Sequence, residues 1–130
     1  MTKEQAKEKA VAALKLVGLE QLADENPYDL ELSERKLVAI ASVLAMDTKV
    51  LILDEPTIAQ NWKGRKIIQK MIRNLSSQGK TVIAILHDMD FVAESFERVI
   101  VMAHGKVLAD GTKEEVFAQK DVLEQARIDQ

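Results

Sequence analysis

Two short apolar runs, each followed directly by polar side chains, constrain the fold of this chain most strongly. Val50-Leu51-Ile52-Leu53 leads into Asp54 and Glu55, and residues 81–86 lead into His87. Uninterrupted apolar runs of this length are typical of buried parallel strands. Apolar residues at helical spacing occupy the segments around them. Because strands then alternate with helices, the sequence predicts an α/β fold with right-handed crossovers.

The spacing of apolar residues, together with glycines and helix-capping residues, predicts the other elements. We expect strands over residues 50–53, 81–86, 98–102 and 106–110, the last two joined as a hairpin at His104-Gly105. We expect helices over residues 3–17, 33–46 and 91–96, a long helix that carries residues 67–75 and ends at Gly79, and a C-terminal helix that begins after Thr112 and continues to residue 128.

Composition narrows the class of protein. The 130 residues contain 18 basic and 21 acidic side chains, a net charge of −3, and no cysteine. These values exclude a disulfide scaffold and disfavour a nucleic-acid partner, which requires a clustered basic surface. No apolar run approaches the ~18–20 residues that span a bilayer, and residues 1–5 begin a charged helical pattern without an apolar leader. We therefore expect one soluble, cytosolic domain over residues 1–130.

Polar side chains at the carboxyl ends of parallel strands meet at one edge of a sheet, where α/β proteins place their chemistry. Asp54 and Glu55 follow one strand and His87 follows the next. Adjacent carboxylates beside a core are costly, and Mg²⁺, which binds one or two carboxylates with waters and phosphate oxygens, would offset that cost. Two structural alternatives stay open: the acids cap the following segment, and His87 packs without a catalytic role. The convergence of all three favours a site for nucleotide phosphates.

Several blocks of the sequence resemble one family, the ATP-binding subunits of ABC transporters. Residues 37–46 resemble the helix after the family's signature sequence, residues 50–57 the Walker B strand with its catalytic glutamate, residues 85–88 the switch-histidine strand, and residues 101–107 and 111–117 the closing hairpin and helix. From Asp29 onward the chain is thus similar to the C-terminal half of such a subunit, especially those of energy-coupling or cobalt-type importers.

The resemblance implies a fold. It is a partial P-loop NTPase core with a mainly parallel sheet, flanking helices and a C-terminal antiparallel hairpin. Residues 29–130 would form the C-terminal part of this core, and residues 1–28 would be a remnant of the family's helical subdomain.

The resemblance also implies roles for single residues. Asp54 would hold Mg²⁺ through water, Glu55 would polarise the water that attacks the γ-phosphate of ATP, and His87 would contact that phosphate and link it to the opposite subunit. The reaction is phosphoryl transfer to water, in which positioning and electrostatics dominate. The implied partners are a second ATPase subunit and membrane transport subunits, which places the protein at the cytoplasmic face of a membrane.

The segment in the place of the family's signature departs from the L-S-G-G-Q pattern. It is Leu30-Glu31-Leu32-Ser33-Glu34. Glu31 replaces a serine that bonds the partner's γ-phosphate, and two like charges about 4 Å apart repel by roughly 4 kcal/mol at an effective dielectric constant of 20. Leu32 and Ser33 replace two glycines, and we expect Ser33 to be a helix N-cap. A register that starts the signature at Leu32-Ser33 is an alternative, but it requires a deletion.

Two residues after the Walker B-like strand also bear on the resemblance. Asn61 stands where the family usually has an aspartate that couples the two sites of a dimer; it keeps a hydrogen-bonding group and loses the charge. Trp62, the single tryptophan, is expected either at an exposed dimer contact or packed at the rim against the following helix.

The sequence contains no G-x-x-x-x-G-K-[ST] pattern, whose backbone N–H groups and lysine bind the β- and γ-phosphates. We therefore expect a truncated ATPase core that is an ATP hydrolase in its full-length parent, is inactive alone, and binds neither ATP nor Mg²⁺ tightly. The missing strand would lie between residues 81–86 and 98–102. Unpaired strand edges there predict a homo-oligomer, a strand-swapped dimer or a rearranged sheet.

A non-enzymatic module of the α/β class is the alternative, either an interaction module or a receiver-like regulator with Asp54 as phosphoacceptor. The sequence Glu55-Pro56-Thr57 speaks against a receiver, and so does the lack of a further acidic pair on a strand ahead of Val50.

Overall fold

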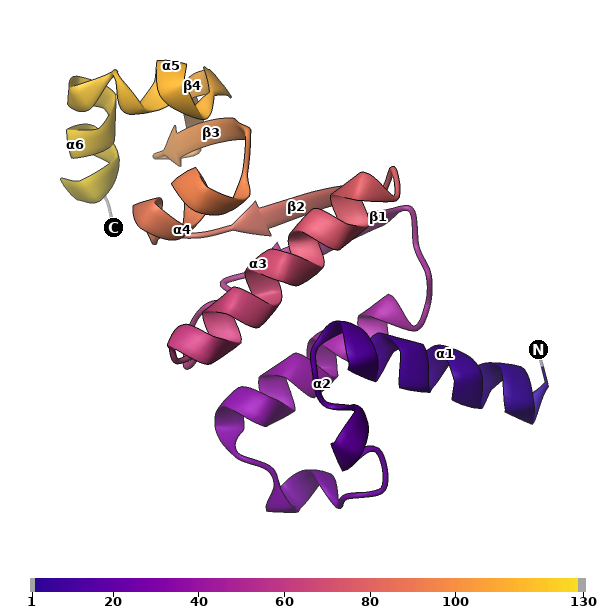
Figure 1. The fold of residues 1–130 in the computed structure, drawn as a ribbon. Helices are drawn as coiled ribbons and strands as arrows, with labels where there is room; N and C mark the ends of the chain where they lie inside the picture. Colours follow the sequence, from indigo (N-terminus) through magenta and orange to yellow (C-terminus); the bar gives the residue numbers. More distant parts are fainter. Residues whose placement is uncertain (1, 129–130) are drawn as a thin grey trace. The chain divides into compact units, whose positions relative to one another are not determined.

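The computed structural model describes residues 2–128, which form two compact units, residues 2–87 and residues 88–128. The first unit contains α1 (Lys3–Leu16), the 3₁₀ turns η1 (Glu20–Leu22) and η2 (Pro27–Asp29), α2 (Leu32–Leu44), β1 (Val50–Asp54), α3 (Trp62–Ser77) and β2 (Thr81–Ile85) (Figure 1). The second contains α4 (Met89–Ser95), β3 (Arg98–Ala103), β4 (Lys106–Thr112), α5 (Lys113–Phe117) and α6 (Lys120–Ile128). The expectation of a single domain over residues 1–130 stays a prediction.

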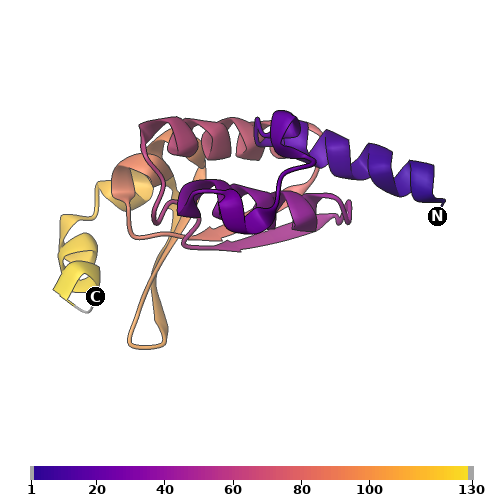
Figure 2. The same ribbon diagram turned by 90° about the horizontal axis from the view of Figure 1, so that it is seen from below.

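The core of the first unit is built around α3. Ile68, Met71, Ile72 and Leu75 are all buried, and their spacing forms one apolar stripe along the helix. This stripe confirms the predicted helix, which lies along the β1–β2 pair in both views (Figures 1 and 2). Gly79, with a φ of +82°, follows the end of the helix as expected.

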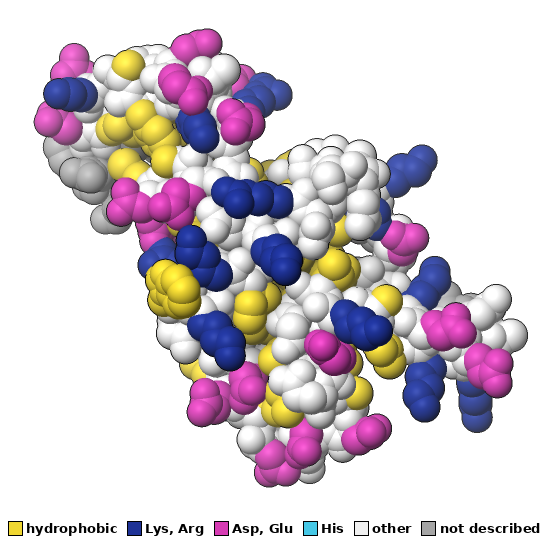
Figure 3. All heavy atoms as spheres, viewed as in Figure 1, with side chains coloured by type: hydrophobic (Ala, Val, Ile, Leu, Met, Phe, Trp, Pro, Cys, Tyr) yellow, Lys and Arg dark blue, Asp and Glu magenta, His cyan; other side chains and the backbone are white. Residues whose placement is uncertain are grey.

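The exposed side of α3 is basic. The helix carries Lys63, Arg65, Lys66, Lys70 and Arg73 and no acidic residue. On the face shown in Figure 3, Lys and Arg side chains gather over this helix. Basic residues are therefore less evenly mixed with acidic ones than the overall charge implies.

β1 and β2 pair in parallel along their whole length, with Val50 opposite Thr81 and Asp54 opposite Ile85. At the start of the pair, the N–H of Thr81 donates to the C=O of Lys49 at 2.9 Å. Lys80 also forms an ion pair with Asp47, and its ammonium group lowers the pKa of that carboxyl below the usual value. Both ends of the two strands are therefore in register.

The prediction that both strands are buried is wrong for one face of the pair. Leu51 and Leu53 are buried, but Ile52 is 65% exposed and its partner Ile83 is 49% exposed. Side chains alternate between the two faces of a strand. α3 covers one face, and the apolar side chains of the other face are exposed within the residues that the structure describes.

The two N-terminal helices pack against each other. Thr2 is the N-cap of α1, and its hydroxyl accepts from the N–H of Gln5 at 3.1 Å. The helix ends before Gly18, which has a φ of +72°. α2 begins earlier than predicted, because Glu31 and not Ser33 is its N-cap. Glu34 Oε1 accepts from the N–H of Glu31 at 3.1 Å, so Ser33 lies inside the first turn.

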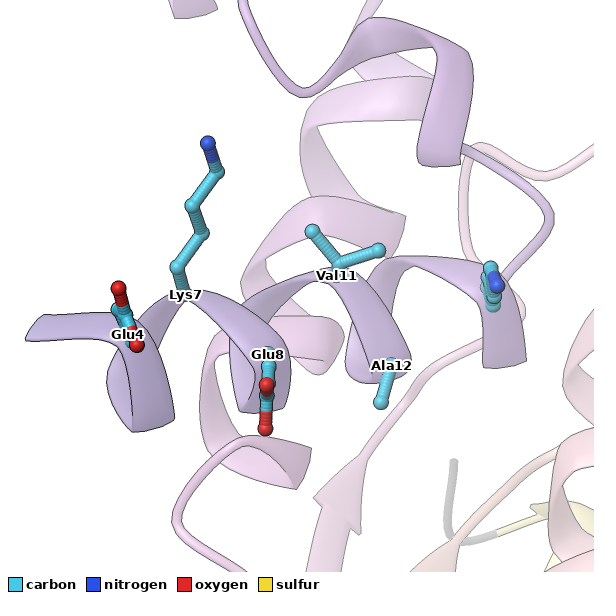
Figure 4. Close-up of a pocket in the computed structure, with 6 residues that line it drawn as sticks. Glu4, Lys7, Glu8, Val11 and Ala12 are labelled. Carbon is cyan, nitrogen blue, oxygen red and sulfur yellow. The ribbon is translucent and has the colours of Figure 1, made fainter.

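A shallow hollow lies on the exposed side of α1. It is lined by Glu4, Lys7, Glu8, Val11, Ala12 and Lys15 (Figure 4). All six residues belong to one helix, so no second element among them forms a wall that would enclose a ligand. We assign it no function.

The second unit is organised by an antiparallel hairpin of β3 and β4. Its turn lies at His104 and Gly105, as predicted, with φ values of +52° and +71° that suit a two-residue hairpin turn. Arg98 donates to Asp110 from Nε at 3.0 Å and from an η nitrogen at 2.8 Å. This bidentate pair crosses from one strand to the other.

The C-terminal helix starts where it was expected but is not continuous. Thr112 Oγ1 accepts from the N–H of Glu115 at 3.3 Å, and Val116 is fully buried. The helix stops at Phe117, and α6 resumes at Lys120. Together with the parallel pair, the hairpin confirms the predicted α/β class; in residues 2–128 the two pairs form separate two-stranded sheets.

The Arg98–Asp110 pair makes the titration of the hairpin testable. Hydrogen bonding from Arg98 lowers the pKa of Asp110. The contribution of the pair to stability is therefore present above the ordinary aspartate pKa of about 3.9 and is lost as the pH falls through the lowered value. Carboxyl NMR should place the Asp110 midpoint below that of a free aspartate, and Arg98→Gln should raise it. Lys106→Gln, on the same hairpin, should leave it unchanged; an unchanged midpoint in Arg98→Gln would contradict the structure.

Candidate functional site

The candidate site lies where β1 and β2 end. Asp54, the last residue of β1, lies opposite Ile85, the last residue of β2. The pairing extends one residue further, because the N–H of Glu55 donates to the C=O of Ile85 at 2.9 Å. The chain segments that follow the two strands therefore leave the sheet side by side.

This pairing brings the side chains of Glu55 and His87 into contact. Nδ1 of His87 lies against Oε1 of Glu55. A carboxylate can only accept a hydrogen bond, so Nδ1 carries the proton in this contact and Nε2 is left for another partner. The His87 side chain is 60% exposed and the Glu55 side chain 21% exposed. The Glu55 carboxylate is thus largely shielded from solvent, whereas the His87 ring that contacts it is largely exposed to solvent.

The backbone at Glu55 is unusual. Its φ of +49° lies in the left-handed region, which costs a residue with a side chain about 1–2 kcal/mol. Ala59, four residues later, has a φ of +64°. Residues held in this region often belong to functional sites. Here the left-handed residue ends β1 abruptly and starts the loop of residues 55–61.

Asp54 supplies the donor type that a magnesium ion prefers. Its side chain is exposed at the end of β1. Within residues 2–128, no group of three or more His, Cys, Asp or Glu side chains is placed so that it could hold a metal ion. Mg²⁺ in phosphate sites commonly uses one or two carboxylates, with waters and phosphate oxygens as its other ligands. Asp54 fits that limited role.

The segment Leu30-Glu31-Leu32-Ser33-Glu34 forms the beginning of α2. Leu32 is 55% exposed, and Glu31 is also exposed. The segment is linked to the loop of residues 55–61 by the amide of Gln60, whose Nε2 donates to the C=O of Ser33 at 3.0 Å. Lys36, in the next turn of α2, donates from Nζ to the C=O of Ile58 at 2.9 Å. The structure thus connects two segments that sequence analysis singled out separately.

Asn61 and Trp62 lie at the start of α3. Asn61 is the N-cap, and its Oδ1 accepts from the N–H of Gly64 at 2.9 Å. Trp62 is 76% exposed, with the ammonium of Lys66 6.0 Å from the centre of its ring. Asn61 therefore has a structural function in this unit, and its predicted coupling role stays a prediction.

Sequence analysis missed Lys36 and Gln60. Neither belongs to a motif, and their partners lie 22 and 27 residues away along the chain. Both bonds end on backbone carbonyls, which any residue supplies. The sequence therefore carried no signal for them.

No helix within residues 2–128 is long and apolar enough to cross a bilayer.

The chain is similar in sequence to one family. The family model described as ABC transporter matches residues 1–58. The "Energy-coupling factor transporter ATP-binding protein EcfA2" of Methanospirillum hungatei is 41% identical over 127 residues, which cover 98% of this chain and 32% of that protein. The protein of the same name from Bacillus cereus is 42% identical over 128 residues, covering 97% of this chain and 44% of that protein.

Solved structures agree with the sequence comparison. cbiO1 from Clostridium perfringens, described as part of the ABC transporter complex cbiONQ, superposes with a TM-score of 0.80 at 36% identity and covers 98% of this chain and 51% of its own. An ATP-binding cassette of an ABC transporter in its ADP conformation gives a TM-score of 0.85 at 27% identity, with 100% and 52% covered.

The chain spans less than half the length of these two curated relatives. Over that span the similarity runs along nearly the whole chain, in sequence and in structure. The resemblance drawn from the sequence is therefore confirmed: over its length the chain matches part of an ABC-transporter ATP-binding subunit.

Proposed function

We propose that this chain carries the water-activating part of the ATP site in an ATP-hydrolysing subunit of an energy-coupling transporter. The observation that carries the proposal is the contact between Glu55 and His87 at the ends of two hydrogen-bonded parallel strands. In α/β proteins this edge of the sheet is where ligands bind. Val50–Asp54 would then be the Walker B strand and His87 the switch histidine.

The geometry suggests how the two side chains act. Glu55 would accept a proton from the attacking water through Oε2, while His87 holds Oε1. Nε2 of His87 would face the γ-phosphate, because Nδ1 is already bonded to Glu55. It would donate to that phosphate in the imidazolium form, in which both ring nitrogens carry a proton. One residue thus orients the base and contacts the substrate.

Asp54 would hold Mg²⁺ through water. When bound, the ion neutralises charge on the phosphate oxygens. Asp54 contributes an exposed carboxylate next to Glu55, which fits an ion that keeps most of its waters.

The proposal assigns Glu55 the largest single effect on turnover. In an intact ATP-binding subunit that contains this sequence, Glu55→Gln removes the base without changing the size of the side chain. General-base loss typically costs 10²–10⁴-fold, so we expect kcat for ATP hydrolysis to fall by at least about 100-fold. Glu20→Gln, an exposed acid on η1, is the matched control and should keep full activity. Equal turnover for the two variants would refute the role of Glu55.

The 130-residue chain alone should bind ATP poorly. Its sequence has no glycine-rich phosphate loop and no accompanying lysine, which supply most phosphate contacts in this class of site. The acidic residues Glu31 and Glu34 at the start of α2 would repel phosphate further. We propose that the isolated chain is inactive and that ATP and Mg²⁺ bind tightly only in the whole subunit.

A titration of the isolated chain with Mg-ATP checks this weakness. Trp62 is exposed and follows the loop of residues 55–61, so its fluorescence serves as the signal, with isothermal calorimetry as a second readout. We expect a dissociation constant no tighter than about 1 mM, a binding free energy of roughly −4 kcal/mol. Micromolar affinity would show that the missing loop does not dominate binding.

In the whole protein, the proposed partners are a second ATPase subunit and membrane transport subunits, at the cytoplasmic face of the membrane. These partners follow from the family and not from any surface described above. Nucleic acid is not among the proposed partners.

The isolated chain is proposed to self-associate. Among residues 2–128, β2 has a hydrogen-bonded neighbour on one edge only, and the exposed face beside it carries Ile83 and Ile85. Open strand edges with apolar side chains tend to pair between copies. Light scattering across a concentration series should give the mass of a dimer or larger species. Ile83→Lys should shift the chain toward monomer, and a sharp monomer of the wild-type chain at all concentrations would contradict the proposal.

A further inference from the structure

We propose that Lys36 and Gln60 are positioning residues that tie the start of α2 to the loop of residues 55–61 and thereby hold Glu55 in its working position. This inference rests on the proposed function of Glu55. It adds two residues that neither the sequence motifs nor the comparisons single out. It also connects residues 30–34, at the start of α2, to the end of β1, where Asp54 and Glu55 lie.

Two hydrogen bonds form the tie. Lys36 donates from Nζ to the C=O of Ile58 at 2.9 Å, and Gln60 donates from Nε2 to the C=O of Ser33 at 3.0 Å. One donor comes from the helix and the other from the loop, so each segment holds the other. The bond from Gln60 is partly buried, which limits competition from water, whereas the bond from Lys36 is exposed.

The loop gains from such support because two of its own backbone hydrogen bonds are long. Inside it, the N–H of Ile58 donates to the C=O of Glu55 at 3.3 Å, and the N–H of Gln60 donates to the C=O of Thr57 at 3.2 Å. Glu55 and Ala59 both have left-handed backbone angles, which are unfavourable for residues with a side chain. Such a backbone persists only when its surroundings fix it. The bond from Lys36 reaches the loop between these two residues.

The amide of Gln60 also packs against α3, where its Oε1 is buried without a hydrogen-bond partner among the described residues. A Cβ added to Gly64 would collide with Oε1 of Gln60, so the glycine provides the space in which the amide lies. Asn61 then caps α3 through the N–H of the same glycine. The amide of Gln60 is therefore held between the first turn of α3 and the C=O of Ser33.

The tie has a direct consequence for Glu55. A shift of the first turn of α2 would move the carbonyl of Ser33 to which Gln60 donates, and it would lengthen or shorten the bond from Lys36 to the carbonyl of Ile58. The N–H of Ile58 donates to the carbonyl of Glu55, so the shift would reach Glu55. Misplacement of a reacting group by about 1 Å can cost 10²-fold in rate. Loss of the tie should therefore lower turnover without removing any group that contacts ATP.

The test is made in an intact ATP-binding subunit that contains this sequence. Lys36→Met removes the donor and keeps the aliphatic stem. We expect kcat to fall roughly 10- to 100-fold while KM for ATP stays within about twofold of wild type. Lys36→Arg, which restores a long donor, should recover most of the loss. Lys63→Met, at an exposed lysine of α3, is the matched control and should change neither constant.

Gln60→Leu tests the second bond and the coupling of the two. It should show the same loss of kcat, and the double variant with Lys36→Met should lose less than the product of the two single effects, because both bonds fix one loop. An unchanged kcat in both single variants would overturn the proposal. So would a rise in KM at unchanged kcat, or a failure of Lys36→Arg to restore turnover.

A second readout separates this inference from the proposed function. Amide hydrogen exchange in the 130-residue chain reports on the loop whether or not ATP is hydrolysed. Lys36→Met should speed exchange at the N–H groups of Ile58 and Gln60 by at least about tenfold, a loss of protection of roughly 1.4 kcal/mol. Unchanged exchange overturns the tie. If exchange is faster in Lys36→Met but the intact wild-type subunit hydrolyses no ATP, the tie is supported and the proposed function is refuted.

Discussion

The parallel pairing of β1 with β2 up to their last residues is the constraint on which the site depends. The hydrogen bond from the N–H of Glu55 to the C=O of Ile85 is the last rung of that ladder. A slip by one residue would move every side chain of a strand to the other face of the sheet. It would bury the exposed apolar side chains and separate Glu55 from His87. The same register buries Leu51 and Leu53 and places Glu55 beside His87.

The site is maintained against two unfavourable features. The left-handed backbone at Glu55 costs free energy, and the face of the β1–β2 pair away from α3 exposes isoleucines to water. Three nearby sets of interactions offset the cost of the left-handed backbone at Glu55. They are the hydrogen bonds between β1 and β2, the contact with His87, and the two bonds that join α2 to the loop of residues 55–61. These bonds make the beginning of α2 part of the same rigid arrangement as the carboxylate. A segment that departs from the family's pattern would thus still influence the position of the proposed base.

Elements with strong local signals were predictable from the sequence. Gly18 and Gly79 mark helix ends because glycine adopts a positive φ at low cost, and Gly105 marks the hairpin turn for the same reason. Serine is a common cap, so the sequence predicts Ser33 as the N-cap of α2; the structure places the cap at Glu31, because Glu34 accepts from the backbone N–H there. The sequence overestimates strand burial. An apolar run shows that both faces of a strand could be buried, but it does not show whether another element covers each face. Glu55 and His87 were found as candidates because they follow strands, whereas Lys36 and Gln60 bond to carbonyls that no pattern identifies.

The contact between Glu55 and His87 is tested most directly by ¹⁵N NMR of the imidazole rings in the 130-residue chain. The chain has two histidines, so His104 in the hairpin turn provides an internal reference. The account predicts that the neutral ring of His87 carries its proton on Nδ1, and that Glu55→Gln shifts the Nδ1 resonance of His87 while that of His104 stays in place. A neutral His87 protonated on Nε2, with ring signals that ignore the substitution at residue 55, would contradict it.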